Sequence, residues 1–94
     1  MRAAATDANQ REIVEALRGL GCDVVDVHWL GQHVPGFPDL IVGHRGRSWL
    51  VEVKTAAGKL TPDECVFWSL HHETLPLRVV RTIEDCVQMI EEVL

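Results

Sequence analysis

The chain has no apolar run long enough to cross a membrane. Its longest uninterrupted apolar stretches are about four residues, whereas a transmembrane helix needs about 18 or more. The first ten residues also lack the apolar segment that follows the basic residue of a secretory signal peptide. We therefore expect a cytoplasmic protein with no membrane partner.

The metal-binding spacings of cysteine and histidine are absent too. The three cysteines, Cys22, Cys65 and Cys86, cannot all pair and show no C-x-x-C spacing, which argues against a disulfide framework and a zinc knuckle. We interpret them as small buried hydrophobes. No two histidines stand four residues apart, so a histidine-based zinc site is not expected. There is no G-x-x-x-x-G-K-[ST] loop, so no nucleotide-driven cycle is implied.

Positive charge is scarce. The chain has 9 Lys and Arg against 14 Asp and Glu, which gives a net charge of -5. An acidic chain is not what one expects of a protein that binds a phosphate backbone, unless some carboxylates belong to a cation site, because bound cations reverse the local sign. What is present is an ordinary globular composition, 47% hydrophobic, in a length that suits a single domain over residues 1–94.

Hydrophobic periodicity predicts an α/β domain whose elements follow the order α-β-β-β-α-β-α. The first helix is expected to run from Thr6 or Asp7, either of which can cap it, to about Gly19. The strands are β-branched or alternate in polarity, and are expected at residues 23–30, 37–43, 48–54 and 77–81. We therefore expect a mixed sheet flanked by helices.

The two later helices carry start signals. Thr61 can cap the second helix, with Pro62 at its first position and Glu64 three residues beyond the cap. This helix is expected to reach about His72. Thr82 can cap the last helix, which has an apolar face made of Ile83, Cys86, Val87, Ile90 and Val93 or Leu94. Such a face can be buried against a second copy of the chain, so we expect a two-fold homodimer.

Three charged residues stand at one end of the predicted hairpin. Its turn is centred between Arg45 and Gly46, so Asp39 faces Glu52 whether the loop has two residues or four. Because side chains alternate between the faces of a strand, Lys54 shares a face with Glu52. Directly opposed side chains have Cβ atoms roughly 4.5–5.5 Å apart, and like charges so placed are destabilising. Something must therefore compensate the repulsion between the carboxylates.

A divalent cation would provide that compensation. Two close carboxylates are hard oxygen ligands of the kind that Mg²⁺ or Mn²⁺ takes. The ammonium of Lys54 can orient or deprotonate a water molecule, or stabilise charge on a phosphate. Together these groups suit metal-assisted hydrolysis of a phosphodiester. The alternative is a salt-bridge cluster of Asp39, Glu52 and Lys54 on a solvated face of the sheet.

The same residues resemble a known nuclease motif. The segment GFPDL (residues 36–40) is followed eleven residues later by VEVK (residues 51–54), which is similar to the PD-(D/E)XK motif. With KLTPDE (residues 59–64) the chain resembles more specifically the VRR-NUC family, in which a G-x-PDL strand, an EVK strand and a helix opening LSPxQ come in this order. The resemblance extends from Gly36 to about Arg81 and implies a restriction-endonuclease-like core.

The resemblance implies a role for each motif residue. Asp39 and Glu52 would be the metal-binding carboxylates, with the backbone carbonyl of Val53 as a further ligand. Lys54 would position the attacking water. Families of this kind also place a glutamate of the first helix beside the metal, and Glu12 can take that place because small residues on its stripe allow a close approach to the sheet. The alternative for Glu12 is an ordinary solvent-facing side chain.

One position departs from the family pattern. Where the family has the glutamine of LSPxQ, this chain has Glu64. The capping box explains this glutamate as a bond back to the Thr61 amide, but a carboxylate here can also add a ligand or weaken the approach of a phosphate. Weak substrate contacts, with plain loop surface as their alternative, are predicted for Gln32, His33, Arg45, Arg47 and Lys59. The tryptophans are expected in the core and not as base-stacking platforms: Trp29, Trp49 and Trp68.

The leading hypothesis is a metal-dependent endonuclease that hydrolyses DNA with Mg²⁺ or Mn²⁺. The resemblance further implies a homodimer that acts on branched DNA such as four-way (Holliday) junctions. Two other classes remain open. A non-cutting DNA- or RNA-binding subunit would keep the fold, although it would gain by losing acidic residues that face phosphates. A small dimeric interaction module would use the charged residues as ion pairs, and it would show no specific uptake of Mg²⁺ or Mn²⁺ in calorimetry.

Overall fold

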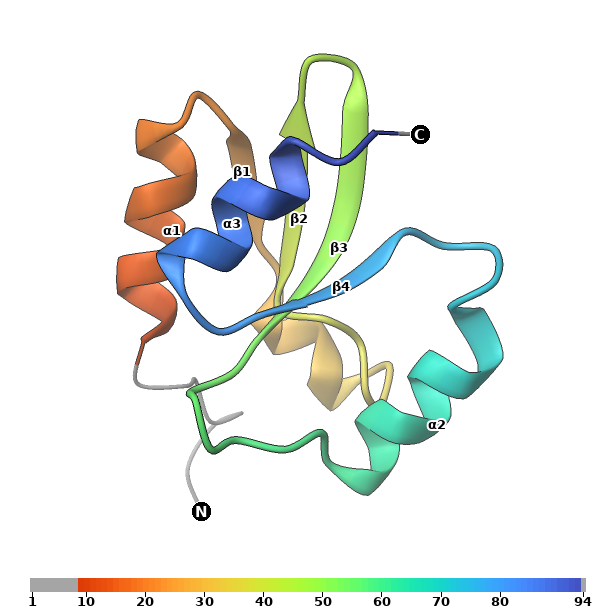
Figure 1. Cartoon of the computed structure of the whole chain (residues 1–94). Coiled ribbons are helices and arrows are strands. Elements are labelled where there is room, and N and C mark those ends of the chain that lie inside the picture. Colours follow the sequence, from red (N-terminus) through yellow and green to blue (C-terminus); the bar gives the residue numbers. More distant parts are fainter. Residues whose placement is uncertain (1–8, 94) are drawn as a thin grey trace.

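The computed structural model of the chain describes residues 9–93 and contains a mixed four-stranded sheet with helices packed against it (Figure 1). The elements in chain order are α1 (Gln10–Gly19), β1 (Asp23–Asp26), the 3-10 helix η1 (His28–Gln32), β2 (Leu40–His44), β3 (Arg47–Val53), α2 (Pro62–His71), β4 (Leu77–Val80) and α3 (Ile83–Ile90). The strands lie in the order β1-β2-β3-β4, with β1, β2 and β3 antiparallel and β4 parallel to β3. The predicted α/β class, element order and mixed sheet are confirmed.

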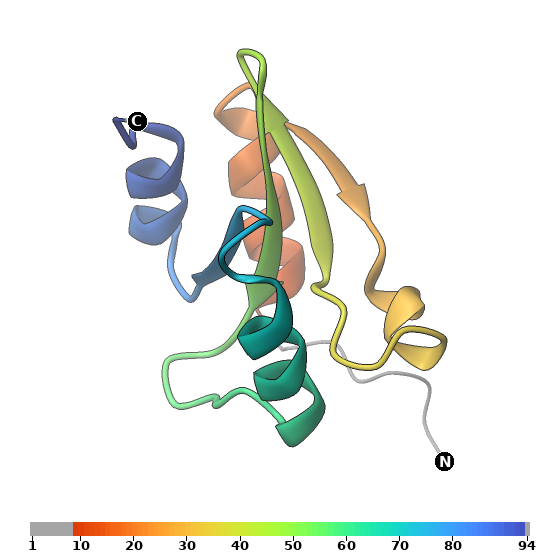
Figure 2. The same cartoon turned by 90° about the vertical axis from the view of Figure 1, so that its right-hand side faces the viewer.

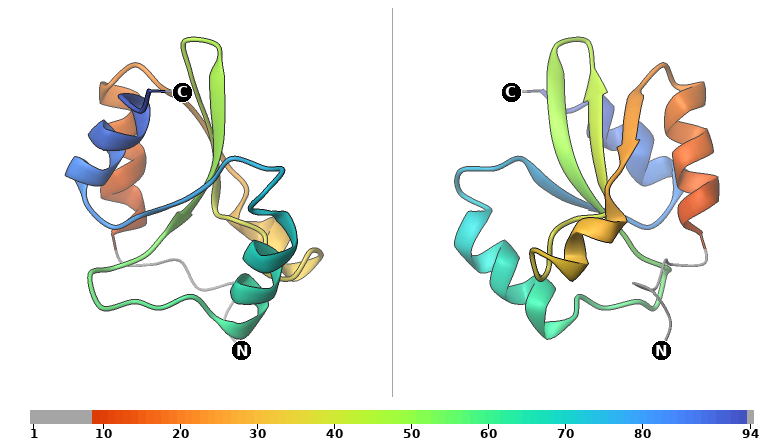
Figure 3. Two further views of the ribbon diagram at one scale, coloured as in Figure 1. Left: turned by 45° about the vertical axis from the view of Figure 1, so that its right-hand side comes forward. Right: turned by 180° about the vertical axis from the view of Figure 1, so that it is seen from behind.

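Two helices, α1 and α3, cover one face of the sheet, while α2 and η1 lie beyond it at one end (Figure 2, Figure 3). The covered face is apolar because alternate strand residues point toward these helices. Its core consists of Ile13, Leu17, Cys22, Val24, Leu40, Val42, Trp49, Val51, Val53, Val80, Cys86 and Met89. None of the helices within residues 9–93 combines the length and the apolar character needed to cross a membrane.

The hairpin of β2 and β3 has the predicted register. Its two turn residues, Arg45 and Gly46, both have positive φ, 51° and 80°, which is the geometry of the tight turns that suit the twist of a hairpin. Leu40 pairs with Val51 at the other end of the ladder. One step further, Asp39 comes opposite Glu52.

The strand predicted at residues 23–30 is shorter than expected. It ends at Asp26, whose Oδ1 accepts a hydrogen bond of 3.0 Å from the backbone N–H of His28, a local turn that competes with further strand pairing. The chain then forms η1, which leaves Trp29 52% exposed. The interpretation of Trp29 as a core residue was therefore wrong.

The helix starts follow the predictions where the structure describes them. Both Thr61 and Thr82 cap their helices in complete capping boxes, with Glu64 and Asp85 as the reciprocal partners. The predicted caps Thr6 and Asp7 lie outside the described residues, and α1 begins at Gln10.

The apolar face of α3 is used in part within one chain. Cys86 is 0% exposed and Ile90 packs against the core, whereas Ile83 and Val93 are 42% and 95% exposed. The face is therefore only partly covered within the chain, and the homodimer stays a prediction. All three cysteines are free, but Cys65 is exposed, which corrects its interpretation as a buried hydrophobe.

Candidate active site

Asp39 enters the site from the loop that precedes β2. In this loop Gly36 has a φ of +82°, and a Cβ at this position would collide with the backbone carbonyl of Asp63 in α2. Only glycine therefore lets the loop lie directly on that helix. On its other side the loop is held by the backbone N–H of Val27, which donates to the Asp39 carbonyl at 2.8 Å. The loop is fixed between α2 and β1 and presents the Asp39 carboxylate to β3.

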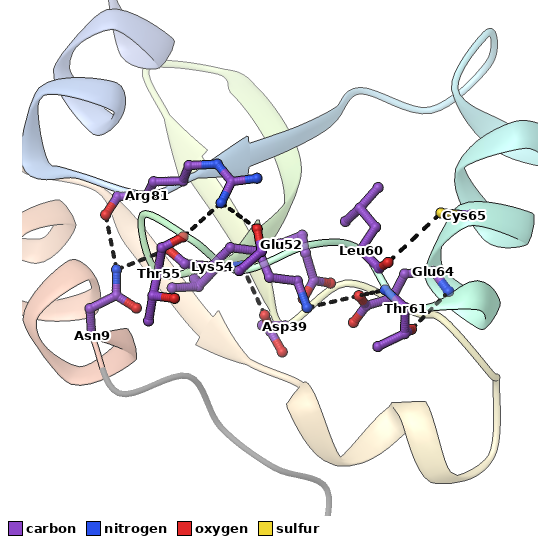
Figure 4. Close-up of polar contacts among 12 residues, drawn as sticks. Asn9, Asp39, Glu52, Lys54, Thr55, Leu60, Thr61, Glu64, Cys65 and Arg81 are labelled. Carbon is purple, nitrogen blue, oxygen red and sulfur yellow. Dashed lines mark hydrogen bonds and ion pairs between the residues drawn. The ribbon is translucent and has the colours of Figure 1, made fainter.

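At the end of β3, a backbone N–H bonds to a side chain instead of to the backbone of the neighbouring strand. The backbone N–H of Val53 donates to Asp39 Oδ2 at 2.8 Å (Figure 4). In an antiparallel ladder the N–H and C=O of one residue point to the same neighbour, and the register places Pro38 opposite Val53. Proline has no N–H to donate. The Pro-Asp pair therefore provides no main-chain donor for the Val53 carbonyl.

Glu52 and Lys54 are buried on the face of the sheet that points away from α1 and α3. Their exposed fractions are 4% and 7%, although buried charges are costly unless they are paired. Lys54 Nζ lies 3.6 Å from Glu52 Oε2 and 2.8 Å from Glu64 Oε1. Figure 4 shows Lys54 reaching from the end of β3 to the start of α2, where it meets Glu64.

The two neighbouring carboxyl groups affect each other strongly. Burial, followed by the negative charge of Asp39, raises the pKa of Glu52 far above its usual range, and a hydrogen bond with the Asp39 carboxyl acts in the same direction. Lys54 opposes this shift but does not cancel it. Lys54 thus lies between the carboxyl groups of Glu52 and Glu64, and Glu52 in turn interacts with the carboxyl group of Asp39.

The donor chemistry of these residues fits a hard divalent cation. Within residues 9–93, no group of three or more His, Cys, Asp or Glu side chains is arranged to hold a metal ion. Mg²⁺ nevertheless needs only one or two carboxylates, because it keeps several of its waters. Asp39 and Glu52 provide two close carboxylates, and the Val53 carbonyl can add a third oxygen. Burial is the largest cause of the raised pKa of Glu52 and the charge of Asp39 adds to it, so a bound cation would offset part of the electrostatic cost of this pair.

Comparison with known proteins identifies the fold. No family model and no curated protein sequence matches the chain. A solved structure described as a VRR_NUC domain matches it with a TM-score of 0.67 and 26% sequence identity, over 90% of this chain and 92% of that chain. The chain has the fold of a VRR-NUC domain. Its fold is thus that of a nuclease-type domain, and the resemblance read from the motif residues is confirmed.

Three predicted contact residues of the VRR-NUC domain lie at the same end of the sheet as Asp39. Gln32 and His33 are exposed at the end of η1, which follows the strand paired with β2. Lys59 is exposed in the loop that connects Lys54 to α2. All three side chains are therefore accessible to a substrate, and their contacts with it stay a prediction.

The two arginines of the hairpin turn lie far from the site. Arg47 is five residues before Glu52 on β3, which is about 17 Å at the rise of an extended strand. Arg47 Nη1 donates instead to the backbone carbonyl of Glu92 at 2.6 Å, and its guanidinium lies 4.8 Å from the ring centroid of Trp49. Arg45 is exposed at the turn itself. The structure does not bring either arginine to the carboxylates of the VRR-NUC domain.

The first helix turns a different residue inward from the one expected. Glu12 is exposed on α1, whereas Gln10 is only 3% exposed and donates through Nε2 to Asp26 Oδ2 at 3.1 Å. Its Oε1 has no hydrogen-bond partner among the described residues. The assignment of Glu12 beside a metal is therefore not supported by its position.

Sequence reasoning missed the two side chains that hold the strand ends together. Asn9 Nδ2 donates to the backbone carbonyls of Lys54 at 3.0 Å and of Arg81 at 2.9 Å. Arg81 Nη1 donates to the carbonyls of Thr55 and Gly58, each at 2.6 Å (Figure 4). A single polar residue before a helix or after a strand carries no signal for such contacts, because their partners are backbone groups far away in the sequence.

Proposed function

We propose that this VRR-NUC domain is a cytoplasmic endonuclease that hydrolyses DNA phosphodiester bonds with the help of Mg²⁺ or Mn²⁺. The observation that carries the proposal is the pairing of Asp39 with the buried Glu52 beside the buried Lys54. A stable sheet does not require this pairing, and like charges in a buried place cost stability. The proposal takes residues 1–94 as one domain.

Each site residue has a defined role in this proposal. Asp39, Glu52 and the carbonyl of Val53 hold the cation. A divalent ion bound there supplies Lewis-acid polarisation of the phosphate and lowers the pKa of a bound water molecule. Lys54 directs its ammonium to the attacking water or to the charge that develops on the phosphate. Because Lys54 is only 7% exposed, its charge acts in a low-dielectric environment, where it is stronger than in water.

The acidity of the chain makes binding of DNA depend on the cation. With a net charge of -5, the chain as a whole repels a phosphate backbone. A bound cation reverses the sign at the site itself. We therefore expect DNA binding to be weak in EDTA and to strengthen when Mg²⁺ or Mn²⁺ is added, as measured by fluorescence anisotropy of a labelled duplex.

A salt-bridge cluster without catalytic function is the competing explanation, and the contact of 2.8 Å between Lys54 and Glu64 favours it. Glu64 fits this explanation, because its contacts with Lys54 and Thr61 lower its pKa. Glu52 does not need Asp39 beside it to pair with Lys54, and a second carboxyl group next to a buried one costs stability. The pairing of these two carboxyl groups therefore supports the metal site.

The decisive experiment is a cleavage assay on a panel of labelled flaps, forks, four-way junctions and linear duplex. We expect products on a denaturing gel with Mg²⁺ or Mn²⁺, none in EDTA, and a preference for branched substrates. Asp39→Asn is the matched variant, because its amide oxygen can still accept the bond from the Val53 N–H. Equal cleavage by this variant, or cleavage in EDTA, would reject the proposal. Sedimentation of the same protein measures the predicted homodimer.

A further inference from the structure

Lys54 has its closer ionic contact with the helix and not with its own strand. Its Nζ lies 2.8 Å from Glu64 Oε1 but 3.6 Å from Glu52 Oε2. Glu64 is in the first turn of α2, so this ion pair joins the helix to the end of β3 (Figure 4). The helix start is therefore part of the surroundings of the proposed catalytic lysine.

Glu64 is itself firmly held. The oxygen that contacts Lys54, Oε1, also accepts a hydrogen bond of 2.8 Å from the backbone N–H of Thr61, while the N–H of Glu64 donates to Thr61 Oγ1 at 3.2 Å. The Glu64 side chain is 18% exposed. Burial raises the pKa of Glu64, but the bonds from Lys54 and Thr61 outweigh it and leave the pKa below its usual value. A charged oxygen is thus fixed in place by the helix cap.

A lysine side chain needs such an anchor if its ammonium is to act at one point. Its flexible stem has about 2 kcal/mol of rotamer entropy, and its ammonium imposes no planar geometry of its own. Glu52 is a poor anchor, because it lies farther away and is assigned to the cation. Glu64 is close, charged and held by the Thr61 N–H, and it takes no part in the assigned donor set.

We propose that Glu64 is a positioning residue that holds the ammonium of Lys54 at the reaction centre. This inference rests on the proposed function, in which Lys54 acts on water or phosphate. It also gives a reason for a glutamate where a glutamine is usual. Both residues can complete a capping box, but only glutamate adds the opposite charge that fixes the lysine.

The test compares Glu64→Gln with Asp85→Asn. Asp85 completes the corresponding capping box of α3, where its Oδ2 accepts from the N–H of Thr82 at 3.2 Å, so Asp85→Asn makes the same chemical change in a helix cap away from Lys54. The first readout is the rate at which a small acylating reagent labels Lys54 at fixed pH without metal, measured by peptide mass spectrometry. We expect Glu64→Gln to raise this rate roughly tenfold, as for loss of one charge-assisted hydrogen bond. Asp85→Asn should leave it unchanged.

The second readout is the split between kcat and KM on the best DNA substrate. We expect Glu64→Gln to lower kcat roughly tenfold with little change in KM, because the variant disturbs a group that acts in the transition state. Thr61→Ala controls for the cap, since it removes the Thr61 hydroxyl but keeps the backbone N–H and the charge of Glu64. This variant should lower the Tm without changing the labelling of Lys54.

Two results would overturn the inference: unchanged labelling of Lys54 in Glu64→Gln, or equally increased labelling in Asp85→Asn or Thr61→Ala. These labelling results are independent of nuclease activity. If the wild-type protein cleaves no DNA, the proposed function fails, while the labelling still decides whether Glu64 fixes Lys54.

Discussion

Strand β3 contributes to two groups of charged side chains. In one group opposite charges pair with each other, and in the other carboxyl groups lie side by side. The first group, which we call the arginine cluster, consists of Arg47, Arg78 and Glu92. Two guanidinium groups share one carboxylate there, with Arg78 Nη2 at 2.7 Å and Arg47 Nη2 at 3.7 Å from Glu92 Oε1. The side chains are 25–37% exposed, so water screens whatever charge remains unpaired.

The second group, the carboxylate cluster, consists of Asp39, Glu52, Glu64 and Lys54. Here the ammonium of Lys54 contacts two carboxyl groups, a third belongs to Asp39 beside Glu52, and the side chains of Glu52, Glu64 and Lys54 are only 5–18% exposed. The pKa values separate the two clusters. The hydrogen bond from Arg78 lowers the pKa of Glu92, whereas burial and Asp39 raise that of Glu52.

The difference shows which cluster stability alone can explain. The arginine cluster places opposite charges together at a partly exposed site, as an ordinary surface network does. The carboxylate cluster accepts an electrostatic cost in a buried place, and a cost of this kind is characteristic of functional sites. The following changes test that distinction, each with a counterpart from the arginine cluster.

The two clusters should differ most in how substitutions affect the rate of DNA cleavage. Lys54→Met keeps the apolar stem of the side chain but removes the ammonium, and we expect the rate to fall by roughly 10²–10⁴-fold, the usual contribution of general acid–base groups. Arg47→Met makes the corresponding change in the arginine cluster and should leave the rate within about twofold, because such surface pairs contribute little. Gel assays at saturating Mn²⁺ measure both rates. Equal losses in the two variants would contradict the distinction.

Divalent metal should stabilise the wild-type fold. A ligand that binds only the folded state stabilises it by about 2.7 kcal/mol at 100 times its Kd. Thermal melts with increasing Mg²⁺ or Mn²⁺ should therefore raise the Tm of the wild type and of Glu92→Gln alike. The shift should disappear in Glu52→Gln, because the variant lacks one of the two carboxylates. A shift that survives in Glu52→Gln would place the cation elsewhere.

Without metal, Glu52→Gln should be more stable than the wild type. Folding raises the pKa of Glu52 above its ordinary value of 4.5, so its favourable contribution is complete below about that pH and is lost as the pH rises toward the folded-state pKa. At pH 8 in EDTA the wild-type fold is destabilised by the unfavourable ionisation of Glu52, and glutamine, which does not ionise, removes this destabilisation. We expect a gain of at least about 1.4 kcal/mol, the equivalent of one pKa unit, and a smaller loss of stability between pH 5 and pH 8 than in the wild type. Denaturant melts at these two pH values measure both effects.

The smallest effect expected is on stability, when Glu92 of the arginine cluster is replaced by glutamine. Folding lowers the pKa of Glu92, so its contribution is present above the ordinary glutamate pKa and is lost as the pH falls through the folded-state value. Glu92→Gln should cost only about 0–1 kcal/mol at neutral pH, since the pair is partly exposed and screened. Added salt should reduce the cost further. A loss of several kcal/mol in a urea melt would show that this cluster is also strongly coupled.

The register of the hairpin could be predicted because it depends on local information alone. The turn at Arg45 and Gly46 fixes which residues face each other, and alternation then fixes the faces. The cap of α2 could also be predicted from Thr61 and Glu64, because a capping box is contained in a few consecutive residues. The ion pair between Glu64 and Lys54 could not be predicted from the motif, because Lys54 lies on a different element from Glu64.

The errors concern features that depend on distant partners. Successive residues of a helix are about 100° apart around its axis, so Gln10 and Glu12 point in very different directions, and only packing decides which is buried. Arg47 is close to Glu52 in sequence, but an extended strand separates their side chains. The early end of β1 is an exception with a local cause, the bond between His28 and the Asp26 side chain, because a polarity pattern does not show which side chains bond to the backbone.

The bridge made by Asn9 ties together parts of the chain that are made at different times. Its amide nitrogen binds the carbonyls of Lys54 and Arg81, which lie 45 and 72 residues away in the sequence. Contacts of such large sequence separation form slowly and require the intervening chain. During synthesis on a ribosome, the motif residues will have emerged well before Arg81 arrives to close this bridge and the loop after Lys54. We therefore expect the nascent chain to complete this bridge only after Arg81 has emerged from the ribosome.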